Sequence, residues 1–192
     1  WVDAHGDLNL PETTPSGNIH GMPASVALGR GPEGLVNLGR PGPKVEVGDL
    51  VHIGIRDLDF HEVSQLAEGR HTYYSMMEID AYGILEVTRA ALKKVSRNFT
   101  IPVHFSFDLD VVDPDEAPGV GTPVPGGLTF REAHLMMELI SDARLQDGRP
   151  LVHSLDLVEV NPILDHRNRT ANMAVGLAVS ALEQRRLPLR PL

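Results

Sequence analysis

The chain has 192 residues, of which 42% are apolar and 22% charged, and its 26 acidic and 17 basic residues give a formal net charge of −9. This composition is typical of one soluble globular domain, and the acidic balance argues against a nucleic-acid surface. There is no cysteine, so thiolate nucleophiles and thiolate metal ligands are excluded, and any metal must bind through nitrogen or oxygen. No apolar run approaches the roughly 20 residues of a membrane helix.

Short apolar, β-branched stretches predict strands at residues 50–55, 103–107 and 151–157. Residues 1–3 resemble the last step of a further buried strand, so we expect the sequence to lack something upstream. Nearly continuous apolar runs are typical of parallel strands buried on both faces. Helical patterns follow at residues 79–95, 130–140 and 171–184, and Thr129 with Glu132 predicts a capping box at the second helix. The alternation predicts an α/β domain with a mostly parallel sheet.

Long loops rich in glycine and proline are predicted at residues 10–23, 29–48 and 113–127. Loops at the carboxyl ends of parallel strands are where such sheets build their sites. The tail at residues 185–192 is basic and interrupted by proline, so we expect it to end the last helix and either fray or pack on a neighbouring subunit.

Carboxylates and an imidazole gather after two predicted strands. Asp3, His5 and Asp7 alternate after the first strand, and Asp108 and Asp110 alternate after the strand at 103–107. Alternate residues of an extended segment point the same way, so each set is expected to converge. Four carboxylates would repel one another without cations, and two divalent ions would balance their charge. Nitrogen and oxygen ligands suit manganese, although cobalt, nickel and zinc stay open. Taken alone, an Asp-x-Asp pattern also fits an ordinary loop start or helix cap.

These motifs resemble those of the ureohydrolase family, and within it the bacterial arginases. The resemblance is carried by WVDAHGD at 1–7, SGNIHGMP at 16–23, SFDLD at 106–110, GVGTP at 119–123, GGLT at 126–129 and EVNP at 159–162. The motifs follow the family's order and cover essentially the whole chain. The resemblance implies a three-layer α/β/α fold of the arginase/deacetylase type. It also implies that residues 1–192 form a single domain that is incomplete at its N-terminus, because the family's upstream Gly-Gly-Asp-His segment is missing.

The resemblance also implies roles in a binuclear manganese centre. Asp3 and Asp108 would bridge two Mn²⁺ ions, Asp7 would serve one ion, and His5 and Asp110 would serve the other, with a hydroxide between the ions. A departure from the family pattern follows at Val111, where the family more often has glycine. Valine there would disturb the backbone if a positive φ were required.

Further residues are assigned to the substrate. Glu159 would clamp the guanidinium and His20 would shuttle a proton, while Thr122 would orient the same group or act as a plain turn residue. Contacts to the α-carboxylate and the α-amino group, implied by the resemblance, fall on Asn9, Ser16, Asn18, Asp59 and Glu62. Ser16 and Asn18 also suit turns, and Glu62 could simply open a helix.

The predicted function is therefore manganese-dependent hydrolysis of L-arginine to L-ornithine and urea. Groups that bind the α-carboxylate favour arginine over agmatine, which lacks it. An agmatinase or another amidino hydrolase is one alternative, and an inactive fragment of an arginase is another. We expect a cytoplasmic homo-oligomer, a trimer or hexamer by family resemblance, with a small-molecule substrate and neither nucleic acid nor membrane as a partner.

Overall fold

The strands form one parallel sheet whose centre is held by a single residue. A computed structural model describes residues 1–182; residues 183–192, and with them the prediction for the tail at 185–192, lie outside the described part. Strand β1 (Val51–Ile55) pairs with β2 (Thr72–Ser75), and β3 (Val103–Asp108) pairs with β4 (Val152–Val158), both in parallel. Val2 bridges β1 and β3 through Ile53 and Phe107. The order across the sheet is therefore β2, β1, Val2, β3, β4.

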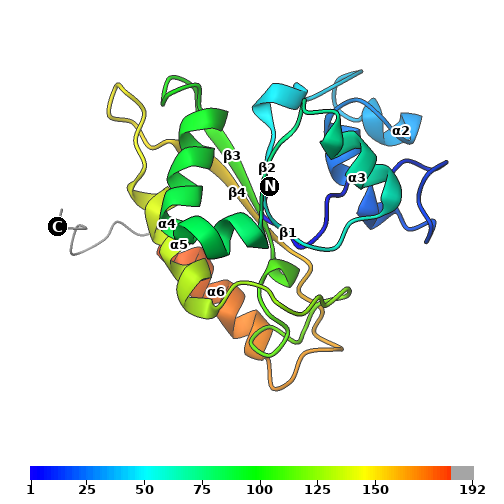
Figure 1. Ribbon diagram of the computed structural model, residues 1–192. Helices are drawn as coiled ribbons and strands as arrows, with labels where there is room; N and C mark the ends of the chain where they lie inside the picture. Colours follow the sequence, from blue (N-terminus) through cyan, green and yellow to red (C-terminus); the bar gives the residue numbers. More distant parts are fainter. Residues whose placement is uncertain (183–192) are drawn as a thin grey trace.

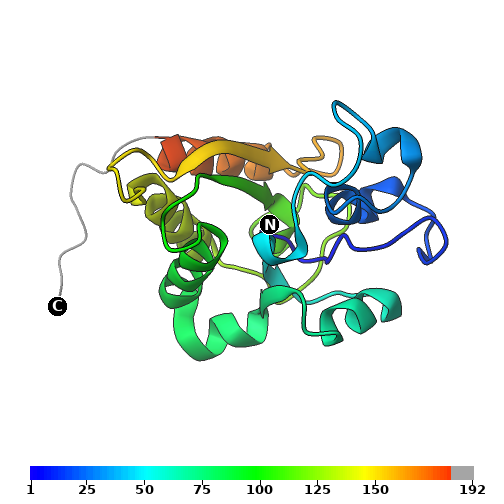
Figure 2. The ribbon, with the colours of Figure 1, turned by 90° about the horizontal axis from the view of Figure 1, so that it is seen from above.

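One side of the sheet is covered by the three long helices, α4 (Met76–Val95), α5 (Phe130–Asp142) and α6 (Arg169–Leu182). Figures 1 and 2 show them together on one side of the strands. Their apolar faces meet alternate strand residues in the main core, which includes Phe105, Phe107, Met136, Met137 and Leu177. Complete burial of each such large side chain contributes about 1.5–3 kcal/mol. This layer fixes the strand ends from which the site is built.

The other side is covered by short helices and loops: α1 (Pro23–Ala27), α2 (Glu33–Val36) and α3 (Phe60–Ala67). Short 3₁₀ turns lie at Ile19–Gly21, at Val47–Asp49 before β1, and at Leu109–Val111 directly after β3. In Figure 1, α2 and α3 lie across the strands from α4, α5 and α6. A second apolar cluster joins α1 and α3 to β1 through Leu8, Ala24, Leu28, Leu50, Ile55 and Leu66. Parallel strands with helices on both sides confirm the predicted α/β/α class.

Several elements differ from the prediction. Burial on both faces is right for β1, whose residues are all buried, but wrong for β4, where Ser154, Asp156 and Val158 are exposed. No described element covers that part of the sheet. Strand β2 was not predicted, and helix α3 was foreseen only in the alternative interpretation of Glu62 as a residue that opens a helix. The predicted helix at 79–95 begins three residues earlier, at Met76, and it is kinked at Gly83, where φ is +79°.

The departure at Val111 does not disturb the backbone. Val111 ends a 3₁₀ turn and is not among the residues with positive φ. Room for its side chain comes from Gly54 of β1, where an added Cβ would lie 2.4 Å from Val111 Cγ2. A glycine on the neighbouring strand therefore accommodates the valine.

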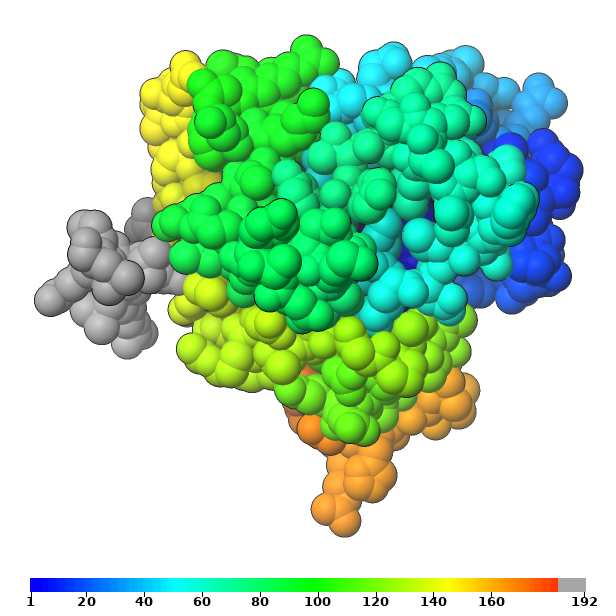
Figure 3. Space-filling view, viewed as in Figure 1, coloured from blue at the N-terminus to red at the C-terminus, as the bar shows by residue number. Residues whose placement is uncertain are grey.

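The segment that joins β4 to α6 stands away from the body of the molecule. It is orange in Figure 3, and its Ile163 side chain is 93% exposed. Within residues 1–182, no helix combines the length and the apolar character that crossing a membrane requires.

Candidate active site

The site begins where the central segment and β3 end side by side. The Asp3 amide donates to the Ile53 carbonyl at 3.0 Å, and the Asp108 amide donates to the Val2 carbonyl at 2.8 Å. These parallel hydrogen bonds bring Asp3 and Asp108 to the same edge of the sheet. The neighbouring aspartate is tied in as well, since Asp110 Oδ1 accepts the Ala4 amide at 3.2 Å.

Turns, and not extended strands, bring the remaining acidic residues inward. Residues 4 and 5 form a bend, and Asp7 has a φ of +53°. Asp110 lies in a 3₁₀ turn, and its amide donates to Asp108 Oδ1 at 2.8 Å. The predicted convergence is therefore observed, but its assumed cause, alternation along an extended chain, is wrong. A positive φ at a non-glycine residue stores strain, and such strain clusters at functional sites.

Asp3, His5 and Asp110 form a compact group with the geometry of a metal site. One ligand atom from each lies within 4.8 Å of the other two. His5 Nδ1 is 3.0 Å from Asp110 Oδ2 and 3.4 Å from Asp3 Oδ1. Asp7 and Asp108 line the same cavity without joining this compact group.

The protonation of the cluster shows how much it needs a counter-charge. Burial, and then the charge of Asp3, raises the pKa of Asp7 from 3.8 to about 9 and that of Asp108 to about 10. The pKa of Asp3 is also raised, chiefly because burial removes water from its carboxylate.

The two remaining members form an ion pair. Burial lowers the pKa of His5, but hydrogen bonds to Asp110 and Asp3 outweigh it and raise that pKa to about 11. Burial raises the pKa of Asp110, but its bond to His5 prevails and the pKa is lowered. One imidazolium cannot balance four carboxylates, whereas divalent cations can, so the residues present fit a metal centre.

One cavity of about 660 Å³ opens onto this cluster. Its lining includes every site residue that the sequence analysis singled out, so residues from five separate segments meet there. Glu159 enters the wall from the end of β4 with a φ of +65°. Besides the acidic cluster and Glu159, the predicted residues that line the cavity are Asn9, Ser16, Asn18, His20, Asp59, Glu62 and Thr122.

Hydrogen bonds already engage several of these side chains. Thr122 Oγ1 donates to Asp110 Oδ2 at 3.2 Å, and Asn9 Nδ2 donates to Asp59 Oδ2 at 2.7 Å. Glu62 is only 3% exposed, and its two oxygens accept the Leu8 and Asp59 amides, both at 2.9 Å. Glu62 thus does open helix α3, as the alternative interpretation held, and it also borders the cavity.

Three charged residues at or near the cavity were not anticipated. Asp57 and Asp156 line it, and His5 Nε2 is 3.9 Å from Asp57 Oδ2. The alternation of Asp57 with Asp59 could have revealed the first, and the position of Asp156 as a charged residue within the apolar run at 151–157 could have revealed the second. Arg56 does not line the cavity, but its guanidinium donates to the Asp110 carbonyl at 2.9 Å. No local pattern in the sequence marks that contact.

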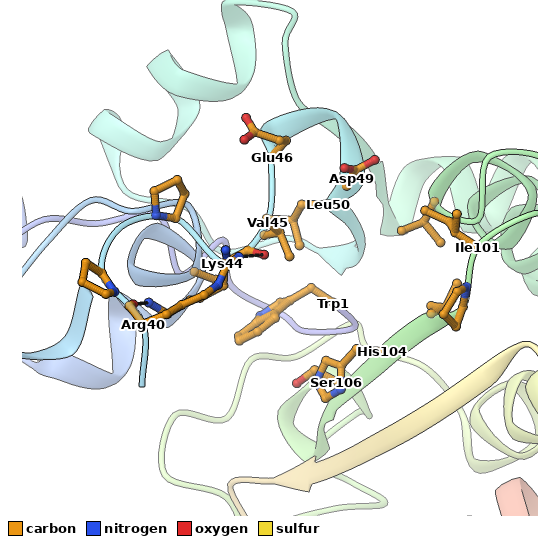
Figure 4. A pocket seen from close by; sticks show the side chains of 16 residues that line it. Trp1, Arg40, Lys44, Val45, Glu46, Asp49, Leu50, Ile101, His104 and Ser106 are labelled. Carbon is orange, nitrogen blue, oxygen red and sulfur yellow. Dashed lines mark hydrogen bonds between the residues drawn. The ribbon is translucent and has the colours of Figure 1, made fainter. Parts of the chain in front are cut away.

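A second cavity, of about 670 Å³, lies on another side of Trp1, beside the first residues of β3 (Figure 4). Two cationic side chains of its lining, Arg40 and Lys44, form hydrogen bonds to nearby backbone carbonyls. Lys44 Nζ donates to the Val36 and Gly42 carbonyls at 2.7 and 2.9 Å, and Arg40 donates to the Lys44 carbonyl at 3.1 Å. Among the described residues, the compact group of metal-ligating side chains borders the first cavity and not this one. The candidate chemistry therefore belongs to the first cavity.

Comparison with known proteins agrees with this geometry. The family model described as "Arginase family" matches residues 1–183. The arginase of Bacillus subtilis (strain 168) is 49% identical over 187 residues, which are 97% of this chain and 60% of that protein, and the arginase of Bacillus caldovelox is 47% identical over 92% of this chain and 57% of its own length. This chain thus spans about 60% of the length of the curated relatives it matches.

Solved structures give the same result. The crystal structure of arginase from Bacillus subtilis subsp. subtilis str. 168 aligns with a TM-score of 0.89 at 49% identity and covers 97% of this chain and 62% of that one. Proclavaminate amidino hydrolase from Streptomyces clavuligerus aligns with a TM-score of 0.69 at 29% identity, over 94% of this chain and 52% of that one. Since the family model matches nearly the whole chain and close relatives share its fold, this chain belongs to the arginase family.

Proposed function

We propose that this chain carries the active site of a manganese-dependent hydrolase that converts L-arginine to L-ornithine and urea. The observation that carries the proposal is the single cavity in which a buried acidic cluster with one imidazole faces a carboxylate, a histidine and neutral hydrogen-bonding side chains. Membership in the arginase family supports the same reaction.

The metal ions would be held by the acidic cluster with its imidazole. Asp3 and Asp108 would be shared between two ions, Asp7 would serve one ion, and His5 and Asp110 would serve the other. When bound, divalent ions would act as Lewis acids and lower the pKa of a water molecule toward about 7, so that a hydroxide nucleophile would be available at neutral pH. Ligands that offer only oxygen and nitrogen suit manganese.

The chain's own residues would hold the substrate in place. The Glu159 carboxylate matches the planar guanidinium with charge-assisted hydrogen bonds and would fix its carbon in one orientation. Thr122 would contribute to the same wall, although it now donates to Asp110. The acidic lining also attracts a cationic substrate over longer distances.

His20 is proposed to deliver the proton that the departing amine needs. It borders the cavity from the exposed 3₁₀ turn at Ile19–Gly21, where it can meet both substrate and solvent. Imidazole is the side chain that most readily exchanges protons near neutral pH.

Other residues of the cavity lining favour an amino acid over a simple guanidine as the substrate. Asn9, Ser16 and Asn18 offer neutral donors to an α-carboxylate, and Asp59 and Glu62 offer oxygens to an α-amino group. Hydrogen-bonding groups left unpaired by agmatine would discriminate strongly against it. Another amidino hydrolase activity is the second candidate, because proclavaminate amidino hydrolase shares the fold.

A manganese titration of the 192-residue chain, followed by assays of urea and ornithine, tests the proposal. We expect manganese-dependent release of urea from arginine and at least about a hundredfold less from agmatine, in line with specificity built on hydrogen bonds. Asp108→Asn should abolish the response to manganese. Absence of manganese binding and of urea release would support the inactive-fragment alternative, and faster turnover of agmatine would support the second candidate. Homo-oligomeric assembly is also proposed, and sedimentation velocity tests it.

A further inference from the structure

Arg56 follows directly after β1 and forms an unusually complete set of hydrogen bonds. Its guanidinium donates to five backbone carbonyls at 2.6–3.3 Å, those of Gly54, Asp110, Val111, Val124 and Pro125. A guanidinium has five N–H donors in a rigid plane, so a single side chain can bind several acceptors at once. The half-buried Arg56 uses this capacity on backbone groups alone.

These acceptors lie at the two ends of one active-site loop. Asp110 and Val111 begin the loop, Val124 and Pro125 lie near its end, and Gly54 belongs to β1. Arg56 therefore ties both ends of the loop to the sheet. Between those ends lies Thr122, whose hydroxyl donates to Asp110 Oδ2 at 3.2 Å.

The loop also leaves space for the guanidinium. A Cβ added at Gly127 would lie 2.5 Å from the Val111 carbonyl oxygen, 2.6 Å from the Asp113 amide nitrogen and 2.7 Å from Arg56 Nη2, so only glycine lets the two ends of the loop approach each other beside the arginine. A second anchor holds the same end of the loop, because Asp113 Oδ2 accepts the Gly126 and Gly127 amides at 2.8 and 3.2 Å. The loop is thus fixed at its base, which is where its Asp110 meets His5.

We propose that Arg56 is a positioning residue, which fixes the loop at 110–127 and thereby holds Asp110 in the acidic cluster and Thr122 beside it. Its effect on metal binding and turnover rests on the proposed function, whereas its effect on the loop does not. Lysine cannot replace it, because an ammonium offers three donors from one point and cannot reach both ends of the loop.

The variants are Arg56→Lys and Arg56→Gln, with Arg144→Gln as the matched control. Arg144 also donates to backbone carbonyls, those of Ser141 and Ala143 at 2.7 and 2.9 Å. Arg144 precedes β4 in the chain, whereas the cavity residue Glu159 follows the carboxyl end of that strand. Hydrogen exchange of the metal-free proteins reports on the loop, electron paramagnetic resonance of free Mn²⁺ reports on affinity, and urea release gives kcat and KM.

In both Arg56 variants we expect at least tenfold faster exchange within residues 111–127, with exchange in α5 and β4 unchanged. Mn²⁺ affinity should fall about 10–100-fold, as is usual when a residue that orients a metal ligand is lost. The fall in turnover should lie in kcat, with KM for arginine within about threefold, because Glu159 is not held by Arg56. Arg144→Gln should leave loop exchange and Mn²⁺ affinity unchanged.

Unchanged exchange at 111–127 in folded Arg56→Gln would overturn the proposal whatever the metal does. Full recovery of loop protection and affinity in Arg56→Lys would also overturn it, since charge alone would then suffice. If the parent chain neither binds Mn²⁺ nor releases urea, the proposed function fails, but loop exchange still decides the role of Arg56.

Discussion

Asp108 is held where it ionises only with difficulty in the absence of a cation. Burial, and then the charges of Asp3 and Asp110, raises its pKa to about 10, although its Oδ1 accepts the Asp110 amide. Asparagine has the same shape, can accept that amide and carries no charge. The aspartate is therefore unfavourable for the metal-free fold and is expected to be useful only with a metal bound.

Asp108→Asn should thus have opposite effects with and without metal. In EDTA at pH 8 we expect the free energy of unfolding to stay equal or to rise, because the folded variant no longer has to hold a proton on a buried carboxyl group. With Mn²⁺ the parent chain should gain about 2.7 kcal/mol at a hundred times its Kd, whereas the variant should lose most of that gain. Urea denaturation with and without Mn²⁺ measures both. An equal manganese gain in the two proteins would contradict the assignment of Asp108.

His20 is a simpler case, because it is exposed where it borders the cavity. His20→Ala should lower kcat about 100-fold or more, the usual contribution of a general acid, and leave Mn²⁺ affinity unchanged. His166→Ala is the control, since His166 is also exposed but lies outside the cavity. Steady-state urea release at several pH values makes the comparison. Equal kcat in the two variants would remove His20 from the mechanism.

At the scale of elements, Gly54 shows how strand β1 restricts the space for a side chain of the 3₁₀ turn that follows β3. Its φ is +93°, and an added Cβ would lie 2.4 Å from Val111 Cγ2. Gly54→Ala therefore combines backbone strain with overpacking, and we expect a loss of roughly 2–4 kcal/mol in the free energy of unfolding.

The double variant Gly54→Ala with Val111→Ala removes the overlap but not the strain. Its loss should be smaller than the sum of the single losses by about 1 kcal/mol. Gly48→Ala is the control, because an added Cβ there meets nothing within 4 Å, and it should change stability by less than about 0.5 kcal/mol. Urea denaturation tests all four proteins. Strict additivity would show that the two side chains do not compete for space.

Elements were predictable where local pattern and tertiary packing agree. The apolar run of β1 is buried on both faces and was found, whereas β4 carries polar residues on a face that no described element covers. Helix α3 has no clear apolar pattern of its own, because Phe60, 90% exposed, and Val63 lie outside the core, so only Glu62 pointed to it. Its capping box, Asp59 with Glu62, was a signal that could have revealed it.

Within the candidate site, the residues that could be predicted are likewise those marked by a local sequence pattern. Short-range motifs named the acidic residues, since Asp3 and Asp108 follow recognisable strands. Arg56 could not be found in this way, because its acceptors at 110–111 and 124–125 lie more than fifty residues further along the chain. Only the fold shows which loop returns to it.

For the whole molecule, the acidic cluster should make metal-free stability depend on pH in an unusual direction. Folding raises the pKa of Asp7 from 3.8 to about 9, of Asp108 to about 10 and of His5 from 6.5 to about 11. A group with a raised pKa binds its proton more tightly in the folded state, so its contribution is largest at low pH and is lost as the pH approaches the folded value. The ordinary pKa values of these three groups all lie at or below 6.5, so above pH 8 the folded chain still holds protons that the unfolded chain has released.

The interval between pH 8 and 9 therefore isolates the cluster. In EDTA we expect the free energy of unfolding to fall by at least about 1 kcal/mol across it, since each raised group contributes up to about 1.4 kcal/mol per pH unit. Saturating Mn²⁺ should remove or reverse this fall, because metal ligands must be deprotonated and binding then strengthens with pH. Urea denaturation at pH 8.0, 8.5 and 9.0, with either EDTA or Mn²⁺, measures both slopes. Asp7→Asn should make the EDTA slope shallower, and a metal-free stability that stays level or rises between pH 8 and 9 would mean that these carboxyl groups are already ionised in the folded chain.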